Sequence, residues 1–346
     1  MRAIANKKIG TWLALVVASA VLALTGSTAS AAPVSINLCA VTGTATLTGS
    51  VTVPIWGFVP KGVAPNCGAL QGTATLPGPV LTVNEGDAVT INVTNALPTG
   101  HAITFEIPGV SFAPGPTDAA VGATVTRSFT VITSPGDTDP AHTKPGTYLY
   151  QSGGDAGRQE AMGLYGALIV RSATALQAYD VATTAYNVEA PLVLSQVDPA
   201  FNNCSTDPNP PCSSNPNNFD MTKYLATYWL INGKAYPDTA RITASAGQRV
   251  LLRYLNAGYD NTTMMVLGMH EQVLARDARL LNNPFGADAE TIPAGATEDA
   301  IATVPSFAGP GTAGGLRGFP LYNRQLHLTN GAPGAPPGGM LTFIGP

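Results

Sequence analysis

The chain has 346 residues, which is enough for about two domains. Only 11% of the residues are charged, well below the roughly 25% usual for soluble domains, and the formal net charge is -4. Because no basic cluster occurs, nucleic acid and anionic membranes are excluded as expected partners. The 37 glycines and 29 prolines, together with many Thr and Val residues, favour strands joined by turns.

The N-terminal segment has the pattern of a signal peptide. Arg2, Lys7 and Lys8 make a positive start, residues 9–24 are apolar, and residues 29–31 fit a small-residue cleavage site. The alternative is a membrane anchor, but the apolar run is short and ends in the cleavage motif. No other stretch is long enough to span a bilayer. We therefore expect an exported mature chain without a membrane anchor.

The chain has four cysteines, an even number, and in an exported protein this favours disulfides. Cys204 and Cys212 flank a turn-rich loop that a disulfide between them would close. Cys39 and Cys67 would then pair by elimination. The alternative is a metal thiolate, but no cysteine is followed closely by the histidine that a blue-copper site uses.

Alternating apolar residues predict strands along most of the chain. Residues 78–98 alternate on both sides of a turn at 84–87, which predicts a hairpin. Residues 124–132 alternate again, and Tyr148 and Tyr150 alternate before a further apolar strand. Long helical periodicity is absent, so the sequence predicts an all-β protein.

An internal repeat divides the chain. Leu81 and Val89 correspond to Ile242 and Val250, a constant offset of 161 positions (242 - 81 and 250 - 89). A second echo links residues 146–170 with the segment near the C-terminus that ends in GGMLTFI. A unit that occurs twice predicts two similar domains, with the Asn-, Pro- and Ser-rich stretch between them as a linker.

Several segments in this order resemble multicopper oxidases, which are built from cupredoxin domains. They are LPGPVLTVNEGDAVTINVTNALP, PGTYLYQSG followed by GLYGALIV, EAPLVLSQVDP, YWLINGKAYPDTARITASAGQRVLLRYLNAG and GGMLTFI. The resemblance implies an all-β fold with two cupredoxin-like Greek-key β-sandwich domains. The expected organisation is a signal peptide (1–31), an N-terminal domain (32–172), a linker with a disulfide-closed loop (173–225) and a C-terminal domain (226–346).

The resemblance also shows where copper ligands would lie. In that family, histidine-rich elements follow particular strands, and by position they fall near residues 104–106, 151–153, 262–270 and 323–325. The ligand positions carry other residues in this chain: Thr104, Glu106, Gln151, Gly153, Thr262, Met265, Leu267, Asn323 and Gln325. The chain has only four histidines, too few for the copper centres of that family. We therefore expect no cofactor and no electron-relay oxidase activity.

A reduced copper site is the remaining metal hypothesis. Met264, Met269 and His270 lie close together in sequence, and thioethers with an imidazole suit Cu(I). If these residues share one strand, Met264 and His270 lie on one face and Met269 on the other. Core packing explains methionines on a strand equally well, so these residues are weak candidates.

The remaining histidines suggest no site. His101 and His142 fall in predicted loops and are expected to be solvated, and His327 is expected to be partly buried against backbone groups. Glu106 replaces a copper ligand and needs a partner if it is buried. We hypothesise that it pairs with Arg324 in the former copper space.

Three hypotheses of function follow. The first is a non-enzymatic, structural or binding protein of the periplasm, cell surface or extracellular space that forms a homo-oligomer or larger assembly, since its sparse surface charge does not oppose self-association. The second is a copper-dependent oxidoreductase or copper-binding protein with a reduced site. A third hypothesis is a small-ligand binder that uses the emptied cavity between the domains.

Overall fold

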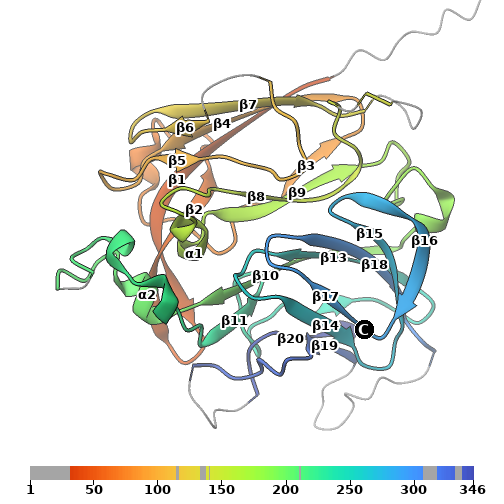
Figure 1. Cartoon of the computed structure of the whole chain (residues 1–346). Coiled ribbons are helices and arrows are strands. Elements are labelled where there is room, and N and C mark those ends of the chain that lie inside the picture. The colour runs from red at the N-terminus through yellow and green to blue at the C-terminus, as the bar shows by residue number, and fades with distance from the viewer. Residues whose placement is uncertain are drawn as a thin grey trace, which may run out of the picture. The chain divides into compact units, whose positions relative to one another are not determined.

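Two cupredoxin-like β-sandwiches follow one another along the chain in a computed structural model (Figure 1). The structure describes residues 32–113, 117–132, 138–139, 141–209, 212–306, 318–331 and 337–346. The predicted signal peptide lies outside these residues. Within them, no helix has the length and apolar character needed to cross a bilayer.

The first sandwich packs two main sheets around one core. One sheet has the order β2-β1-β4-β7 and the other β3-β9-β8, with a small β5-β6 pair beside them. Val89, Ile91 and Val93 on β4 alternate with partly exposed residues and lie in the core. The bounds are β1 Ala32–Leu47, β2 Val51–Pro60, β3 Leu81–Asn84, β4 Asp87–Asn95, β5 Ile103–Thr104, β6 Asp118–Ala119, β7 Thr124–Thr130, β8 Gly146–Gln151 and β9 Tyr165–Arg171.

The second sandwich has sheets of order β11-β10-β13-β18-β15-β16 and β12-β20-β19-β14-β17. Strand β10 lies inside the predicted linker (173–225) and pairs with β13. The bounds are β10 Val188–Val197, β11 Tyr228–Ile231, β12 Ile242–Thr243, β13 Arg249–Asn256, β14 Thr262–Val266, β15 Glu271–Arg276, β16 Arg279–Ala287, β17 Ala289–Ile292, β18 Thr297–Thr303, β19 Phe319–Asn323 and β20 Leu341–Gly345. The helices are α1 Arg158–Met162 and α2 Pro199–Asn203, with 3-10 turns η1 Cys67–Leu70, η2 Ala182–Thr184, η3 Pro216–Asn218 and η4 Met221–Lys223.

The strand topology confirms the internal repeat. Strand β4 runs parallel to β1 and antiparallel to β7, and β13 runs parallel to β10 and antiparallel to β18. In the facing sheets, β3 is parallel to β9 and β12 is parallel to β20. The predicted hairpin at residues 84–87 is wrong, because β3 and β4 lie in different sheets. Alternation predicts both strands but does not decide whether they pair or cross the core.

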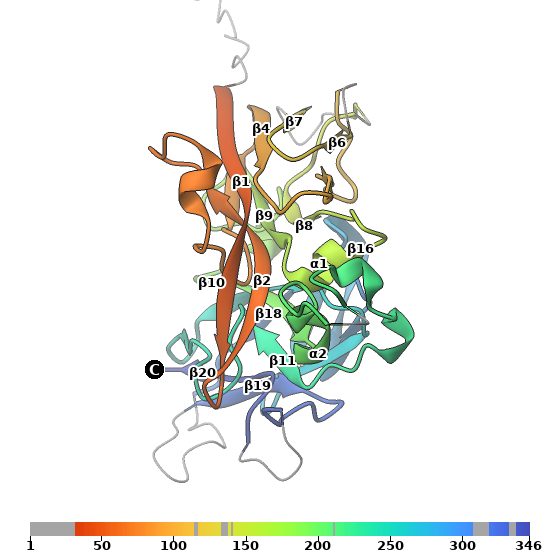
Figure 2. The same ribbon diagram turned by 90° about the vertical axis from the view of Figure 1, so that its left-hand side faces the viewer.

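A long hairpin extends from the first sandwich toward the second. Strand β2 pairs along its whole length with residues 38–47 of β1 (Figure 2). The hairpin shares a buried cluster with Val197, Tyr228 and Leu230 of β10 and β11. Disulfides join Cys39 to Cys67 and Cys204 to Cys212, so both predicted pairings are confirmed.

A buried ionic network joins the two sandwiches. The Arg253 guanidinium on β13 donates to Asp299 at 3.0 Å, to Glu189 at 2.8 Å and to the hydroxyl of Thr147 at 2.9 Å. Asp299 also accepts from the hydroxyls of Thr147 and Tyr179, each at 2.6 Å. Thr147 lies on β8 of the first sandwich, whereas Arg253 and Asp299 lie on β13 and β18 of the second. The network therefore fixes β8 against β13 and β18.

Candidate functional site

The first and second former ligand elements meet on the first sandwich. Glu106 and Gln151 exchange two backbone hydrogen bonds, each 2.9 Å long. The backbone N–H of Thr104 donates to the Ser152 hydroxyl at 3.0 Å. The structure therefore brings together the positions Thr104, Glu106, Gln151 and Gly153.

Gln159 of α1 fills the space beside these positions. Its side chain is fully buried, and its Oε1 accepts from the Ser152 hydroxyl at 2.7 Å. Its Nε2 donates to the Ala102 carbonyl and to the Asp155 carboxylate, each at 2.9 Å. A Cβ on Gly154 would lie 2.6 Å from the Gln159 amide, so a side chain at position 154 would displace that amide from its network. A satisfied hydrogen-bond network thus occupies the region next to the first two elements.

His101 belongs to the same network. The sequence predicts a solvated ring, and this is wrong, because His101 is only 5% exposed. Its Nδ1 lies 2.7 Å from the Asp155 carboxylate, and its ring packs against Trp56 with centroids 4.6 Å apart. The loop position of His101 did not reveal this burial, since Asp155 and Trp56 come from distant parts of the chain.

Replacing Gln159 by Ala is expected to lower the free energy of unfolding by about 2–4 kcal/mol. The change leaves a cavity and removes the partners of buried polar groups, and both effects are costly. Urea denaturation of the two proteins measures the difference. The matched control is Gln272→Ala, because Gln272 is exposed on β15. Equal stability of both variants would contradict the structural role of Gln159.

The hypothesised pair between Glu106 and Arg324 is wrong. No ion pair joins these two described residues; Glu106 is exposed, and the Arg324 guanidinium lies 5.9 Å from the centroid of the Tyr322 ring. Glu106 instead lies beside Glu160, since both carboxylates come within 4 Å of the point where a Cβ on Gly153 would lie. Burial, and then the charge of Glu106, raise the pKa of Glu160 to about 7.

The third and fourth former ligand elements meet on the second sandwich. Met264 of β14 pairs with Asn323 of β19. The backbone N–H of Thr263 donates to the Gln325 side chain at 3.2 Å, and the buried Asn323 amide donates to the same oxygen at 3.2 Å. Among the described residues, no hydrogen bond or ion pair directly joins the ligand positions of this sandwich to those of the first.

The weak copper candidates do not form one cluster. Strand β14 ends at Val266, so the expectation of one strand running to His270 is wrong. Met264 and Met269 are buried in the second core, whereas the His270 side chain is 85% exposed and pairs with Asp288. In the part of the chain that the structure describes, no group of three or more His, Cys, Asp or Glu residues is arranged to hold a metal ion.

The residue types at the former ligand positions do not fit the copper centres of the family. Such centres use imidazole and thiolate ligands. The positions here offer hydroxyl, carboxylate, amide, thioether and hydrocarbon groups, and on the first sandwich they adjoin the Gln159 network. No catalytic step through copper is therefore derived for this arrangement.

A pocket of about 610 Å³ lies among the ends of these elements. Ala156 follows the second element, Asp260 precedes the third, and His327 follows the fourth. The Tyr259 hydroxyl donates to the carbonyl of Gly157 at 2.7 Å and so ties the two sandwiches together at the pocket. The lining residues are Ala156, Gln196, Met221, Tyr224, Leu225, Ala226, Trp229, Tyr259, Asp260 and His327. We call this the aromatic pocket.

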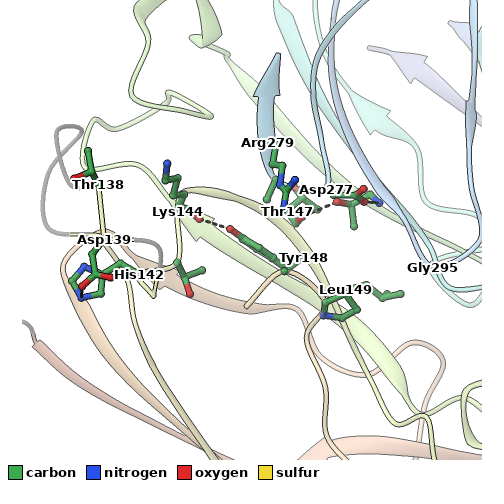
Figure 3. Close-up of a pocket in the computed structure, with 15 residues that line it drawn as sticks. Thr138, Asp139, His142, Lys144, Thr147, Tyr148, Leu149, Asp277, Arg279 and Gly295 are labelled. Atoms are coloured by element: carbon green, nitrogen blue, oxygen red, sulfur yellow. Dashed lines mark hydrogen bonds and ion pairs between the residues drawn. The ribbon is translucent and has the colours of Figure 1, made fainter. Parts of the chain in front are cut away.

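A second cleft of about 630 Å³ lies between β8 and the β15–β16 turn (Figure 3). Its wall includes Tyr148, whose hydroxyl donates to the carbonyl of Lys144 at 2.8 Å. Burial raises the pKa of this hydroxyl, so it stays protonated. Asp277 accepts from the backbone N–H of Thr297 at 3.0 Å. These hydrogen bonds stabilise the walls, and we assign no chemistry to this cleft.

Comparisons with known proteins agree with this fold. Residues 70–175 match the family model of multicopper oxidases. The blue copper oxidase from Nitrosomonas europaea is 21% identical with a TM-score of 0.67, over 90% of this chain and 86% of that protein. The multicopper oxidase mgLAC is 21% identical with a TM-score of 0.68, over 91% and 86% of the two chains. The copper nitrite reductase from Nitrosomonas europaea is 17% identical with a TM-score of 0.64, over 90% and 93%.

No curated protein sequence matches the chain. At identities this low, the structural similarity establishes the shared fold alone. The family model covers the first sandwich from β3 to β9 but not β1 and β2. The resemblance to multicopper oxidases is thereby confirmed at the level of the fold: the chain has their cupredoxin fold.

Proposed function

We propose that the protein is an exported, non-enzymatic protein that uses the cupredoxin scaffold for binding. The observation that carries this proposal is the Gln159 network, which fills the space beside the first two former ligand elements with hydrogen-bonded side chains. The aromatic pocket, which lies among three of the elements, supports a binding role. The signal-peptide pattern supports a location in the periplasm, at the cell surface or outside the cell.

An oxidase assay tests the non-enzymatic role. The mature chain, incubated with copper and then desalted, is expected to oxidise phenol and diamine substrates no faster than buffer. A laccase treated in the same way is the positive control. Copper-dependent turnover by this chain that disappears in His270→Ala would overturn the proposal in favour of a reduced copper site.

Self-association is the second candidate function, and strand β16 favours it. This strand ends the six-stranded sheet, so one edge of its backbone has no strand partner in the described fold. Leu280 and Phe285 on it are 37% and 40% exposed. An exposed edge strand with apolar side chains can pair with a second copy.

Light scattering coupled to size exclusion tests this surface. The mature chain is expected to elute as an oligomer, and Leu280→Lys is expected to shift it toward the monomer, because a charge on an edge strand opposes pairing. Leu326→Lys is the matched control, since Leu326 is 61% exposed and lies far along the chain from β16. A monomer at high protein concentration would contradict self-association.

A further inference from the structure

The aromatic rings of Tyr224, Trp229 and Tyr259 line the aromatic pocket together with the imidazole of His327. The rings of Tyr224 and Tyr259 meet edge to face, with centroids 5.3 Å apart and an interplanar angle of 89°. Trp229 and His327 stack with centroids 4.3 Å apart and an angle of 14°. Two perpendicular tyrosines beside an indole present π surfaces in more than one direction, which suits a compact group that contacts several rings at once.

The only formal charge on the pocket wall is negative. Asp260 is the one acidic residue among the lining residues, and none of them is Lys or Arg. Burial lowers the pKa of His327, although Asp260 opposes this, so its ring is neutral at neutral pH. An aromatic wall with one carboxylate and no cation of its own attracts a positively charged ligand.

Three polar side chains of the wall are hydrogen-bonded within the protein, whereas the buried indole N–H of Trp229 has no partner among the described residues. The Tyr224 hydroxyl donates to the Gln196 carbonyl at 3.3 Å, and the Tyr259 hydroxyl donates to the Gly157 carbonyl. In the orientation that satisfies both its amide atoms, Gln196 donates to Asp260 and accepts from the backbone N–H of Tyr259, each at 3.2 Å. A neutral sugar needs many free hydrogen-bonding groups, whereas a cation needs the ring faces and the carboxylate that remain.

Two further charges lie beyond the Tyr259 hydroxyl. Burial raises the pKa of this hydroxyl, Glu160 raises it further and Arg158 lowers it, and neither charged residue lines the pocket. The Arg158 guanidinium donates to the carbonyls of Asp155 and Phe219, at 3.4 and 3.2 Å, and is not a lining residue. Asp260 therefore dominates the charge that a ligand meets.

We propose that the aromatic pocket binds an alkylated ammonium cation, held by the rings of Tyr224, Tyr259 and Trp229 with Asp260 as its counter-charge. This inference rests on the proposed binding role and specifies its ligand class. A volume of about 610 Å³ accommodates a small molecule that carries such a group.

Titration calorimetry of the mature chain with benzyltrimethylammonium chloride tests the proposal. The wild type is expected to show saturable binding at one site per chain. Asp260→Asn and Tyr259→Leu are each expected to weaken binding about tenfold or more, because a charge pair or a cation–π contact is lost. Tyr259→Phe keeps the ring and is expected to bind within about threefold of the wild type. Circular dichroism confirms that each variant is folded.

Neutral probes separate the ligand classes. The uncharged isostere of choline, 3,3-dimethylbutanol, is expected to bind much more weakly than choline, and glucose is expected not to bind. Equal binding of the isostere, binding of glucose instead, or unchanged affinity in Asp260→Asn would overturn the inference. A copper-free chain that binds no ammonium probe would overturn this inference alone, whereas copper-dependent oxidase turnover would overturn the proposed function alone.

Discussion

Replacing Arg253 by Met lowers the free energy of unfolding by about 3–5 kcal/mol, because it leaves buried carboxylates without their counter-charge. Arg253 and Asp299 each have side chains only 1% exposed, and the Glu189 side chain is 13% exposed. Met fills a similar volume, so the loss reports the charge rather than a cavity. Guanidinium denaturation at neutral pH measures the difference.

The matched control for this prediction is Arg324→Met. Arg324 is exposed and makes no ion pair among the described residues, so its replacement is expected to change stability by less than about 0.5 kcal/mol. If Arg253→Met were as stable as the control, the buried network would not be what fixes the sandwiches together.

The stability of the wild type falls as the pH rises from about 5 to 8, because two core glutamates are protonated in the folded state. Glu271 is 2% exposed, its Oε2 accepts from the Tyr254 hydroxyl at 3.0 Å, and its Oε1 has no partner. Burial raises the pKa of Glu271 from 4.5 to about 8, with Tyr254 opposing the rise and Glu298 adding to it. Burial likewise raises the pKa of Glu298 to about 7, against the hydrogen bond from Arg276.

The free energy of unfolding falls with pH in this range because the folded state binds more protons than the unfolded state. Between the unfolded pKa of 4.5 and the folded pKa of about 8, the folded state holds the proton of Glu271 and the unfolded state has lost it. Stability is therefore fully present below the lower value and is lost as the pH rises toward the higher one. One pKa unit corresponds to about 1.4 kcal/mol, so the loss from Glu271 is at most about 5 kcal/mol.

Urea denaturation at several pH values checks this prediction. Glu271→Gln carries no titratable proton and is expected to show a much flatter decline than the wild type. Asp118→Asn, which changes an exposed carboxylate in the first sandwich, is expected to keep the wild-type decline. Two results would show that Glu271 is ionised in the core. One is a wild-type stability that rises from pH 5 to 8, and the other is a Glu271→Gln variant whose stability declines as steeply as that of the wild type.

Much of the fold could be predicted from the sequence. The alternation around Leu81 and Val89 predicts strands, and the constant offset to Ile242 and Val250 predicts two copies of one unit. The placement of β3 and β4 in different sheets could not be predicted. A tight turn between two strands permits both a hairpin and a crossing from one sheet to the other. The domain boundaries and the linker stay predictions, although β10 lies within that linker and pairs with β13.

The replacement of the copper ligands stays a prediction, because it rests on the resemblance and on the residue types at each position. The side chains that lie beside these positions could not be predicted. Gln159 comes from a short helix after a glycine-rich loop, and His101 meets Asp155 only in the folded chain. The predicted pair of Glu106 and Arg324 is wrong. A sequence pattern places each residue on an element, but it does not give the direction of the side chain. The aromatic pocket likewise combines residues that are far apart in sequence.

The copper content of the mature chain tests the central claim most directly. The protein is produced with excess copper, desalted, and analysed for metal by mass spectrometry together with electron paramagnetic resonance. The account predicts well below one copper per chain and no type 1 copper signal. About one tightly held copper per chain, lost on changing His270→Ala and retained in the control His142→Ala, would contradict it.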